Sequence, residues 1–289
     1  MATTGRDRFE VDPVPDPHPH GPRRFALPPG AVDTHAHVIG ASYIAQRSYT
    51  PTPAPLADYV RMLDAVGMAH GVLVQVSVHG IDNTLLLEAL RAHPQRLRGV
   101  AVTPHRMPAA EWQALADAGV VGLRLNTTTG GGVGVSALAE YEAVCRDLGW
   151  HLQLLVEPDR IEELAPQIGR LRVPVVFDHM GYVTPDDAGG ASGRTLLQLV
   201  RDGAWVKLSG AFRLSRTGPP YADTMAFAQA LAEAAPTRCL WGSDWPHVSF
   251  RGRMPNPGDL LDVLADAVPD AAARDRILVD NPHRLYGFT

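Results

Sequence analysis

The sequence predicts a (β/α)8 barrel, an α/β fold (TIM barrel) in which eight parallel strands alternate with helices around one core. First, eight short apolar runs rich in β-branched residues alternate with segments of helical periodicity, which is typical of repeated βαβ units. Second, the length of 289 residues fits one such barrel, because these barrels commonly need about 250 residues. Third, ionisable side chains follow several of the apolar runs, where a barrel keeps its active site.

The expected strands are short and apolar, as strands of a parallel sheet buried on both faces should be. In chain order they are Ala31–His37, Gly71–Ser77, Leu97–Val102, Val120–Leu125, His151–Val156, Val173–Asp178, Trp205–Leu208 and Cys239–Ser243. A doubly wound open sheet is the alternative. However, no GxGxxG motif follows the first strand, and eight units suit closure into a barrel better.

The expected helices lie between these strands and are identified by their apolar residues at helical spacing. They are Pro55–Val66, Thr84–Ala92, Ala109–Ala118, Ser136–Leu148, Ile161–Arg170, Gly193–Arg201, Tyr221–Ala235 and Pro257–Val268. We therefore expect one barrel domain over residues 31–289. Residues 1–30 form a Pro-rich N-terminal extension, and because proline fixes φ and lacks an N–H, this extension should be an extended strap or a partly disordered arm.

Composition excludes several classes of partner. The net charge of −5 argues against nucleic acid, which normally requires a basic patch. The two cysteines, Cys145 and Cys239, lack CxxC spacing and fit buried thiols in a reducing compartment. No apolar run is long enough to cross a membrane, and the first residues do not resemble a secretory signal. We therefore expect a cytoplasmic protein, either a monomer or a homodimer, that acts on a small molecule.

The first chemically distinctive feature is a pair of histidines, His35 and His37, at the end of the first expected strand. Alternate side chains of a strand share one face, so both imidazoles project in the same direction. Such a pair also arises by chance in a chain with 12 histidines. Its significance therefore depends on what the other strand ends carry.

Ionisable residues also occur at or just after the fourth, sixth and eighth expected strands, where the chain carries Arg124, His179 and Asp244. Because the carboxyl ends of the strands meet at one mouth of a barrel, we expect these side chains to lie beside the histidine pair. For Asp244, two residues before a proline, a helix N-cap is the structural alternative. Asp178 alternates with His179, so it is expected to point toward the helical layer and to make a structural hydrogen bond.

The strand-end motifs together resemble the amidohydrolase superfamily, of the amidohydrolase-2 type. Within it, the chain is most similar to 2-pyrone-4,6-dicarboxylate lactonase and related lactone hydrolases. The likeness extends from about Pro28 to the C-terminus and depends on the order and spacing of several motifs. These motifs are His35-Ala36-His37, Val74–Asn83, Gly122–Asn126, Asp178–Gly181, Trp241–His247 and Asn281–Tyr286.

The resemblance implies a hydrolase that opens a carboxylated lactone or a similar ester. Ester hydrolysis needs an activated water, a polarised carbonyl and stabilisation of the oxyanion. The resemblance gives the role of general base to Asp244. His35, His37 and His179 are then expected to donate hydrogen bonds to the carbonyl oxygen.

A metal is not expected in this site. Two histidines and an aspartate can hold Zn²⁺, but the fifth expected strand has no histidine at its carboxyl end, and the fourth offers Arg124, which cannot ligate while protonated. The lactonases that the chain resembles are implied to work without a metal. A single Zn²⁺, with Glu157 or His179 as a substitute ligand, is the alternative.

The resemblance also implies an anionic substrate. Arg124 and Arg213 match positions at which the dicarboxylate lactonase holds carboxylates, and a guanidinium suits bidentate binding, although either arginine could form a surface ion pair instead. Further pocket positions are matched by Tyr49, Ser77, His79 and His247.

The chain departs from the lactonase pattern at two places. The segment Thr127–Gly132 lacks an arginine found in the dicarboxylate lactonase, and Leu155 replaces a tyrosine. We therefore expect a monocarboxylated lactone or a different ring, with the Thr/Gly loop as a mobile lid. A decarboxylase or a lactone isomerase of the same superfamily, with or without one zinc ion, is the alternative function, and a non-catalytic binding protein is the third.

Overall fold

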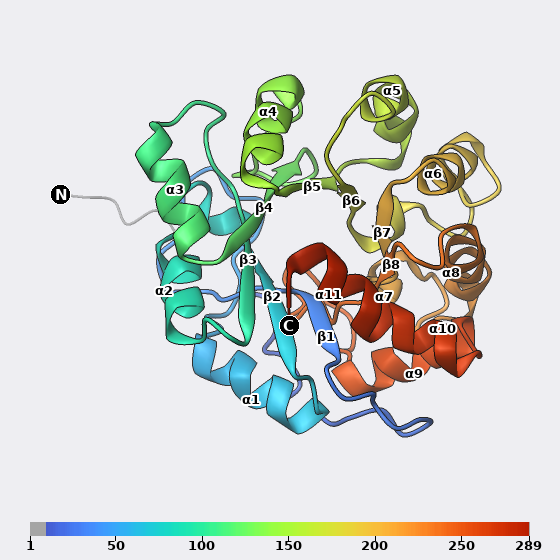
Figure 1. Cartoon of the computed structure of the whole chain (residues 1–289). Helices are drawn as coiled ribbons and strands as arrows, with labels where there is room; N and C mark the ends of the chain where they lie inside the picture. The colour runs from blue at the N-terminus through green and yellow to red at the C-terminus, as the bar shows by residue number, and fades with distance from the viewer. Residues whose placement is uncertain (1–9, 289) are drawn as a thin grey trace.

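The computed structural model describes residues 10–288 and has the predicted architecture, eight parallel strands surrounded by helices (Figure 1). Each strand pairs with the next along the chain. The strands are β1 (Val32–Ala36), β2 (His70–Val74), β3 (Leu97–Ala101), β4 (Val120–Asn126), β5 (His151–Leu155), β6 (Val175–Phe177), β7 (Trp205–Lys207) and β8 (Cys239–Leu240). All eight predicted strands are therefore confirmed, although β6, β7 and β8 are shorter than expected.

The eight predicted helices are also present. They are α1 (Leu56–Val66), α2 (Thr84–Ala92), α3 (Ala109–Asp117), α4 (Leu138–Leu148), α5 (Pro158–Ile168), α6 (Ala191–Arg201), α8 (Ala222–Ala234) and α9 (Pro257–Ala267). The largest error is at α5, which begins three residues early because Pro158 occupies its first turn, where a proline is well tolerated. None of the described helices is long and apolar enough to cross a membrane.

Of the six short helical segments in the described chain that the sequence did not predict, three come directly after strands. The six are η1 (Ser77–His79), η2 (His179–Tyr182), α7 (Ala211–Leu214), α10 (Ala271–Asp275), η3 (Arg276–Asp280) and α11 (Asn281–Tyr286). Most of these segments have only four to six residues. They are therefore too short to produce a periodic apolar pattern. The first three follow β2, β6 and β7 and therefore shape the mouth of the barrel.

The barrel closes where the segment after β8 runs along β1. The amide of Thr34 donates to the carbonyl of Trp241 at 3.1 Å, and the amide of Asp244 donates to the carbonyl of His35 at 2.8 Å. The buried carboxylate of Asp33 strengthens this seam, since it accepts hydrogen bonds from the amide of Ser243 at 2.8 Å and from its hydroxyl at 2.6 Å. The position of Asp244 is thus fixed by direct backbone contact with β1.

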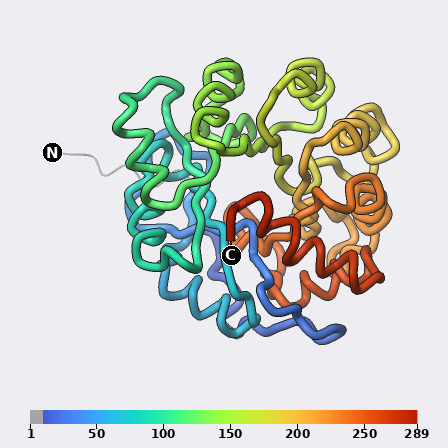
Figure 2. The backbone as a smooth tube through the Cα atoms, in the orientation of Figure 1, coloured from blue at the N-terminus to red at the C-terminus, as the bar shows by residue number. Residues whose placement is uncertain are grey.

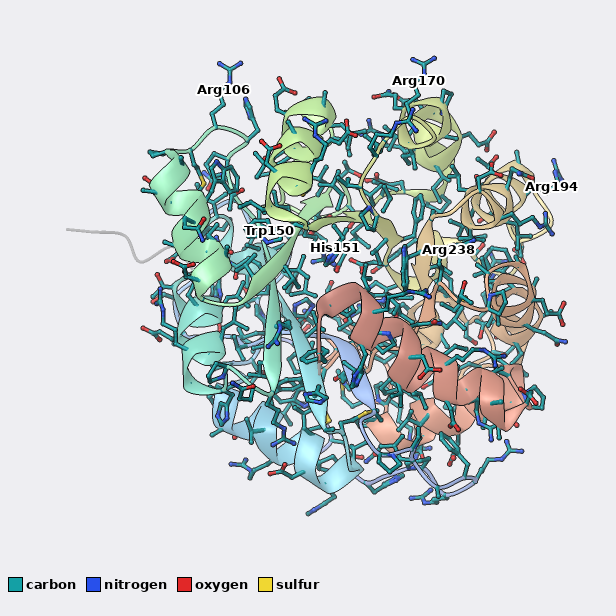
Figure 3. All side chains as sticks on the ribbon, in the orientation of Figure 1. Arg106, Trp150, His151, Arg170, Arg194 and Arg238 are labelled. Carbon is teal, nitrogen blue, oxygen red and sulfur yellow. The ribbon has the colours of Figure 1, made fainter. Side chains whose placement is uncertain are left out.

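The opposite end of the barrel is covered by the C-terminal helices (Figure 2). Tyr286 of α11 packs edge-on against the ring of His151, which opens β5, with 5.2 Å between the ring centroids. Figure 3 shows His151 among the inward-facing side chains, whereas Arg106, Arg170 and Arg194 point away from the molecule. His151 therefore lies at the end of the barrel away from the mouth, and His93 is the C-cap of α2.

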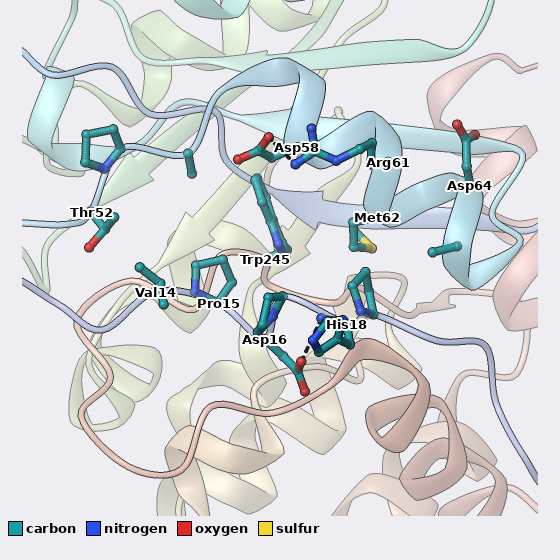
Figure 4. Close-up of a pocket in the computed structure, with 15 residues that line it drawn as sticks. Val14, Pro15, Asp16, His18, Thr52, Asp58, Arg61, Met62, Asp64 and Trp245 are labelled. Atoms are coloured by element: carbon teal, nitrogen blue, oxygen red, sulfur yellow. Dashed lines mark hydrogen bonds and ion pairs between the residues drawn. The ribbon is translucent and has the colours of Figure 1, made fainter.

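Residues 10–30 lie along the outside of the barrel. The buried carboxylate of Asp12 accepts a hydrogen bond from the amide of Ser249 at 2.6 Å, and the amide of Asp12 donates to the carbonyl of Thr50 at 2.8 Å. A groove separates this segment from α1, and Trp245 forms part of its wall (Figure 4). Residues 1–9, which belong to the predicted extension, lie outside the described part of the chain.

The seam between β1 and β8 leaves no room for a side chain at Gly242. A Cβ atom there would lie 2.6 Å from Cβ of His35 and 2.8 Å from its amide nitrogen. We predict that Gly242→Ala lowers the free energy of unfolding by about 1–3 kcal/mol, the usual range for overpacking. Urea denaturation measures this change.

Gly134 provides the matched control, because it is exposed and a Cβ there would meet no atom within 4 Å. Gly134→Ala should change the stability by less than about 0.5 kcal/mol, as surface substitutions usually do. Equal effects of the two substitutions would contradict the close contact at the seam.

Candidate active site

A cavity of about 320 Å³ lies at the carboxyl end of the barrel. Seven of the predicted site residues line it: His37, Tyr49, Ser77, Arg124, His179, Arg213 and Asp244. His35 lies directly beneath, fully buried, with its ring centroid 5.1 Å from that of His37 and 4.5 Å from that of His179. The structure thus brings together the residues from β1, β4, β6 and β8 that the sequence placed at one mouth.

Two predicted pocket residues are not part of this lining. His79 faces a neighbouring hollow, where its ring stacks on that of Tyr43 at 6.4 Å. His247 is buried against Phe212, with 5.2 Å between the ring centroids. Tyr49 and Ser77 lie in the cavity wall and are hydrogen-bonded to each other at 3.0 Å.

Asp244 is the carboxylate of the cavity. The residue has a φ of 61° and is 1% exposed. Its Oδ2 accepts a hydrogen bond from Nε of Arg213 at 2.5 Å, whereas its Oδ1 has no hydrogen-bond partner among the described residues. Burial raises the pKa of Asp244, but Arg213 and then His179 and His35 outweigh this effect, so the pKa lies well below its usual value. The carboxylate is therefore ionised and has one oxygen available.

Three imidazoles surround this carboxylate. Nε2 of His35 and of His37 lie 3.9 and 3.8 Å from Oδ1 of Asp244, and Nε2 of His179 lies 3.7 Å from Oδ2. Burial lowers the pKa of His37 to about 3 and that of His179 to about 4, and it holds the pKa of His35 well below its usual value. All three rings are consequently neutral at pH 7.

The prediction that Asp178 points toward the helical layer is wrong. Asp178 is buried inside the barrel mouth, where its Oδ2 accepts hydrogen bonds from Nε of Arg124 at 3.1 Å and from Nε2 of Gln153 at 3.0 Å. Its Oδ1 lies 3.2 Å from Nδ1 of His35 and 3.4 Å from Nζ of Lys207. Asp178 therefore links β1, β4, β5 and β7 by polar contacts.

The backbone after β6 explains this error. Strand geometry ends at Phe177, and the next residues turn sharply, with φ values of 48° at His179, 53° at Met180 and 65° at Gly181. The alternation of side chains applies only within a strand. Because the chain leaves the strand between Asp178 and His179, both side chains reach the mouth of the barrel.

The sequence did not identify Lys207, which ends β7 in a strongly apolar context. It is fully buried, and its Nζ lies 2.9 Å from the carbonyl of Thr34, 2.9 Å from Oε1 of Gln153 and 3.2 Å from Nδ1 of His35. A lysine inside a short apolar strand was the available signal, because lysine is almost never fully buried unless it is paired.

Arg124 and Arg213 line the cavity, and in each guanidinium Nε and one of the two amino groups contact other protein groups. Arg124 uses Nε and Nη2 for Asp178, and Arg213 uses Nε for Asp244 and Nη1 for the carbonyl of Val248 at 2.9 Å. Within residues 10–288, Nη1 of Arg124 and Nη2 of Arg213 make no hydrogen bond. Both side chains therefore keep one amino group for a ligand in the cavity.

The loop after β4 is held by its own side chains. Oδ1 of Asn126 accepts hydrogen bonds from the amide of Thr128 at 2.9 Å and from its hydroxyl at 3.0 Å, while Nδ2 donates to Thr129 at 2.7 Å. The amide of Gly130 donates to the hydroxyl of Ser48 at 2.7 Å. Thr128 and Thr129 thus present neutral hydroxyl groups to the cavity.

Two sets of residues have potential metal-ligand atoms within 4.8 Å of one another: His35, His37 and Asp244, and His35, Asp178 and His179. The donor types suit zinc. The surrounding charge does not fit a divalent cation, because the two carboxylates of this mouth already face three cationic side chains, those of Arg124, Lys207 and Arg213. An added ion would be repelled by all three.

Comparison with known proteins identifies the family. Residues 32–288 match the family model described as amidohydrolase. The chain is 40% identical over 297 residues to a 4-sulfomuconolactone hydrolase of Rhizobium radiobacter, covering 97% of this chain and 98% of that relative. It is 36% identical to a 2-pyrone-4,6-dicarboxylate hydrolase of Comamonas testosteroni, covering 91% and 92%.

A solved structure shares the architecture. It is a probable 2-pyrone-4,6-dicarboxylic acid hydrolase from Acinetobacter baumannii with citric acid bound, which is 31% identical and has a TM-score of 0.80, covering 90% of this chain and all of that one. The barrel with its acid and histidine cluster is thus that of a hydrolytic enzyme class. The chain belongs to the amidohydrolase family.

Proposed function

We propose that this protein hydrolyses a lactone that carries a carboxylate or another anionic group. The observation that carries the proposal is an ionised carboxylate, Asp244, with one free oxygen among three neutral imidazoles at the floor of an arginine-lined cavity. The relatives named above act on lactones, by their names. Their similarity over nearly the whole chain supports the same reaction class here.

The reaction follows from the positions of these groups. A water beside Oδ1 of Asp244 loses a proton to that oxygen as its own oxygen attacks the lactone carbonyl carbon. Hydrogen bonds from the imidazole cluster stabilise the oxyanion that forms. When the ring C–O bond breaks, the protonated Asp244 returns the proton to the leaving alkoxide, and the carboxylate is regenerated.

The substrate class follows from the walls of the cavity. The unpaired amino groups of Arg124 and Arg213 suit a carboxylate or a sulfonate. Leu155 and Phe250 supply apolar surface for a ring, and Thr129, whose hydroxyl accepts from Nδ2 of Asn126, offers a neutral donor. We propose a lactone with one strongly held anionic group rather than the pyrone dicarboxylate.

A panel of lactones tests the function, with proton release as the signal. We predict turnover of a lactone that carries a carboxylate or a sulfonate and slower turnover of a neutral lactone. Asp244→Asn should lower kcat by at least about 10²-fold, the usual contribution of a general base, without loss of the fold. Asp147→Asn on the exposed surface is the control and should keep the rate.

Product analysis completes this test. Ring opening consumes one water, whereas an isomerase product keeps the mass of the substrate and a decarboxylase releases carbon dioxide. Either of the last two results, or an Asp244→Asn variant with more than about a tenth of the original rate, would overturn the proposal.

Arg213 should set the pH range of the reaction, because it is the largest influence that lowers the pKa of Asp244. In Arg213→Met the burial of the carboxylate is no longer offset by this charge, so the pKa of Asp244 rises. The base must be ionised, and activity is lost as the pH falls through its pKa. The acidic limb of the profile should therefore move to higher pH by about one unit or more.

The control for this experiment is Arg216→Met. Arg216 lies three residues after Arg213 and forms an exposed ion pair with Asp186. Its pH profile should match that of the unmodified protein. An unchanged acidic limb in Arg213→Met would show that this guanidinium does not tune the base.

We also propose that the reaction needs no metal, a proposal supported by the three cationic side chains around Asp178 and Asp244. Protein treated with a strong chelator and assayed in metal-free buffer should keep its full rate, and elemental analysis should find substoichiometric zinc. Loss of activity on chelation with recovery on adding stoichiometric Zn²⁺ would refute this prediction.

We propose a cytoplasmic location, which is supported by the two cysteines. Cys145 and Cys239 are both buried and unpaired. Burial raises the pKa of each thiol to about 12, so neither is a reactive thiolate. Buried free thiols are typical of proteins from reducing compartments.

A further inference from the structure

We infer that Lys207 is a positioning residue that keeps the proton of His35 on Nε2. As a result, the two histidines of the β1 end present opposite groups to Asp244: His35 presents an N–H donor from beneath the cavity, and His37 presents a lone pair. The tautomers follow from contacts in the protein alone. Their chemical consequence rests on the proposed lactone hydrolysis.

The state of His37 is set by a backbone carbonyl. Its Nδ1 lies 2.8 Å from the carbonyl oxygen of Val74, at the end of β2. A carbonyl only accepts hydrogen bonds, so Nδ1 carries the proton. Since burial keeps this imidazole neutral, with its pKa lowered to about 3, its Nε2 has a lone pair. That lone pair lies 3.8 Å from Oδ1 of Asp244.

The state of His35 is set by an ammonium group. Nζ of Lys207 is hydrogen-bonded to Nδ1 of His35 at 3.2 Å. An ammonium only donates, so Nδ1 of His35 accepts and the proton of the neutral ring resides on Nε2. This Nε2 has no partner among the described residues and lies 3.9 Å from Oδ1 of Asp244.

Asp178 is the competing partner of His35. Its Oδ1 also lies 3.2 Å from Nδ1, and a hydrogen bond to it would place the proton on Nδ1 instead. Asp178 interacts with both His35 and Lys207, but its Oδ1 has no partner in good hydrogen-bond geometry within the described chain, whereas the contact from Lys207 to Nδ1 of His35 does have that geometry. The geometry thus favours the lysine.

Lys207 has its three protons fully used in this arrangement. Besides His35, the ammonium donates to the carbonyl of Thr34 at 2.9 Å and to Oε1 of Gln153 at 2.9 Å. Burial lowers its pKa to about 8, against the opposing effect of Asp178, so the group remains mostly charged at pH 7. With two protons on these acceptors, the third is directed at Nδ1 of His35 at 3.2 Å rather than at Oδ1 of Asp178, which lies further away at 3.4 Å.

The two histidines then divide the reaction between them. The N–H of His35 lies beneath the cavity, 3.9 Å from Oδ1 of Asp244, and orients this carboxylate toward the water. The lone pair of His37 accepts a hydrogen bond from the second O–H of the attacking water, while Asp244 takes the first proton. His37 therefore orients the water, a role different from the carbonyl contact that the sequence suggested for it.

Nuclear magnetic resonance of protein labelled with 15N-histidine tests the assignment without any substrate. Spectra that correlate the ring nitrogens with carbon-bound ring protons distinguish the two neutral tautomers. His35→Gln and His37→Gln identify the two sets of signals. We expect an Nε2–H tautomer for His35 and an Nδ1–H tautomer for His37 at pH 7. An Nδ1–H or a charged His35 overturns the inference.

Substitution of Lys207 tests its role. In Lys207→Met, His35 should change to the Nδ1–H tautomer and donate to Asp178, and kcat should fall by about 10–100-fold, because Asp244 loses the N–H group that orients it, with little change in KM. Gln75→Met is the control, because Gln75 is also buried but its side chain donates to the carbonyls of Gly80 and Asp82, away from Lys207 and His35. It should keep the Nε2–H tautomer.

The outcomes separate the two proposals. A Lys207→Met protein with the Nε2–H tautomer and an unchanged kcat refutes the positioning role. The expected tautomers in a protein that opens no lactone would refute the proposed function and leave the assignment of the histidines standing. If Lys207→Met does not fold, the spectrum of the unmodified protein still decides the inference.

Discussion

The mouth of this barrel depends on the burial of one carboxylate, that of Asp178. A buried carboxylate without partners costs several kcal/mol, so the strands around it must supply donors. Lys207 from β7, Arg124 from β4 and Gln153 from β5 are these donors, all within 3.4 Å of its oxygens. Because each donor extends from a different strand, pairing this one charge also fixes how those strands stand relative to one another.

The two buried carboxylates of the site differ in how fully their oxygens are paired with donors. Asp178 has Oδ2 hydrogen-bonded to two donors and Oδ1 beside Lys207, so it is a fixed counter-charge. Asp244 has one oxygen held by Arg213 and the other without a partner. Only the second arrangement leaves a lone pair that can take a proton from water. The network that satisfies Asp178 therefore also orients His35 toward Asp244.

The sequence was sufficient to predict what depends on regular structure. Buried parallel strands are nearly continuous apolar runs, so all eight were found, and strand ends placed Asp244 and His179 at one mouth. It failed where the chain leaves regular geometry: the turn that begins at His179 brings both Asp178 and His179 to the mouth, so alternation between them did not hold. Contacts between residues distant in the sequence could not be predicted either. Nothing near Lys207 along the chain indicates that it contacts His35 from β1.

Arg213 connects recognition of an anion with the strength of the base. A carboxylate whose pKa lies well below its usual value is a weak proton acceptor, and Arg213 is the main cause of that low pKa. The same guanidinium lines the cavity, where a bound anion would share its charge with Asp244. A second negative charge nearby raises the pKa of a carboxylate. Binding of the anionic substrate therefore makes Asp244 a stronger base at the moment when the water must be deprotonated.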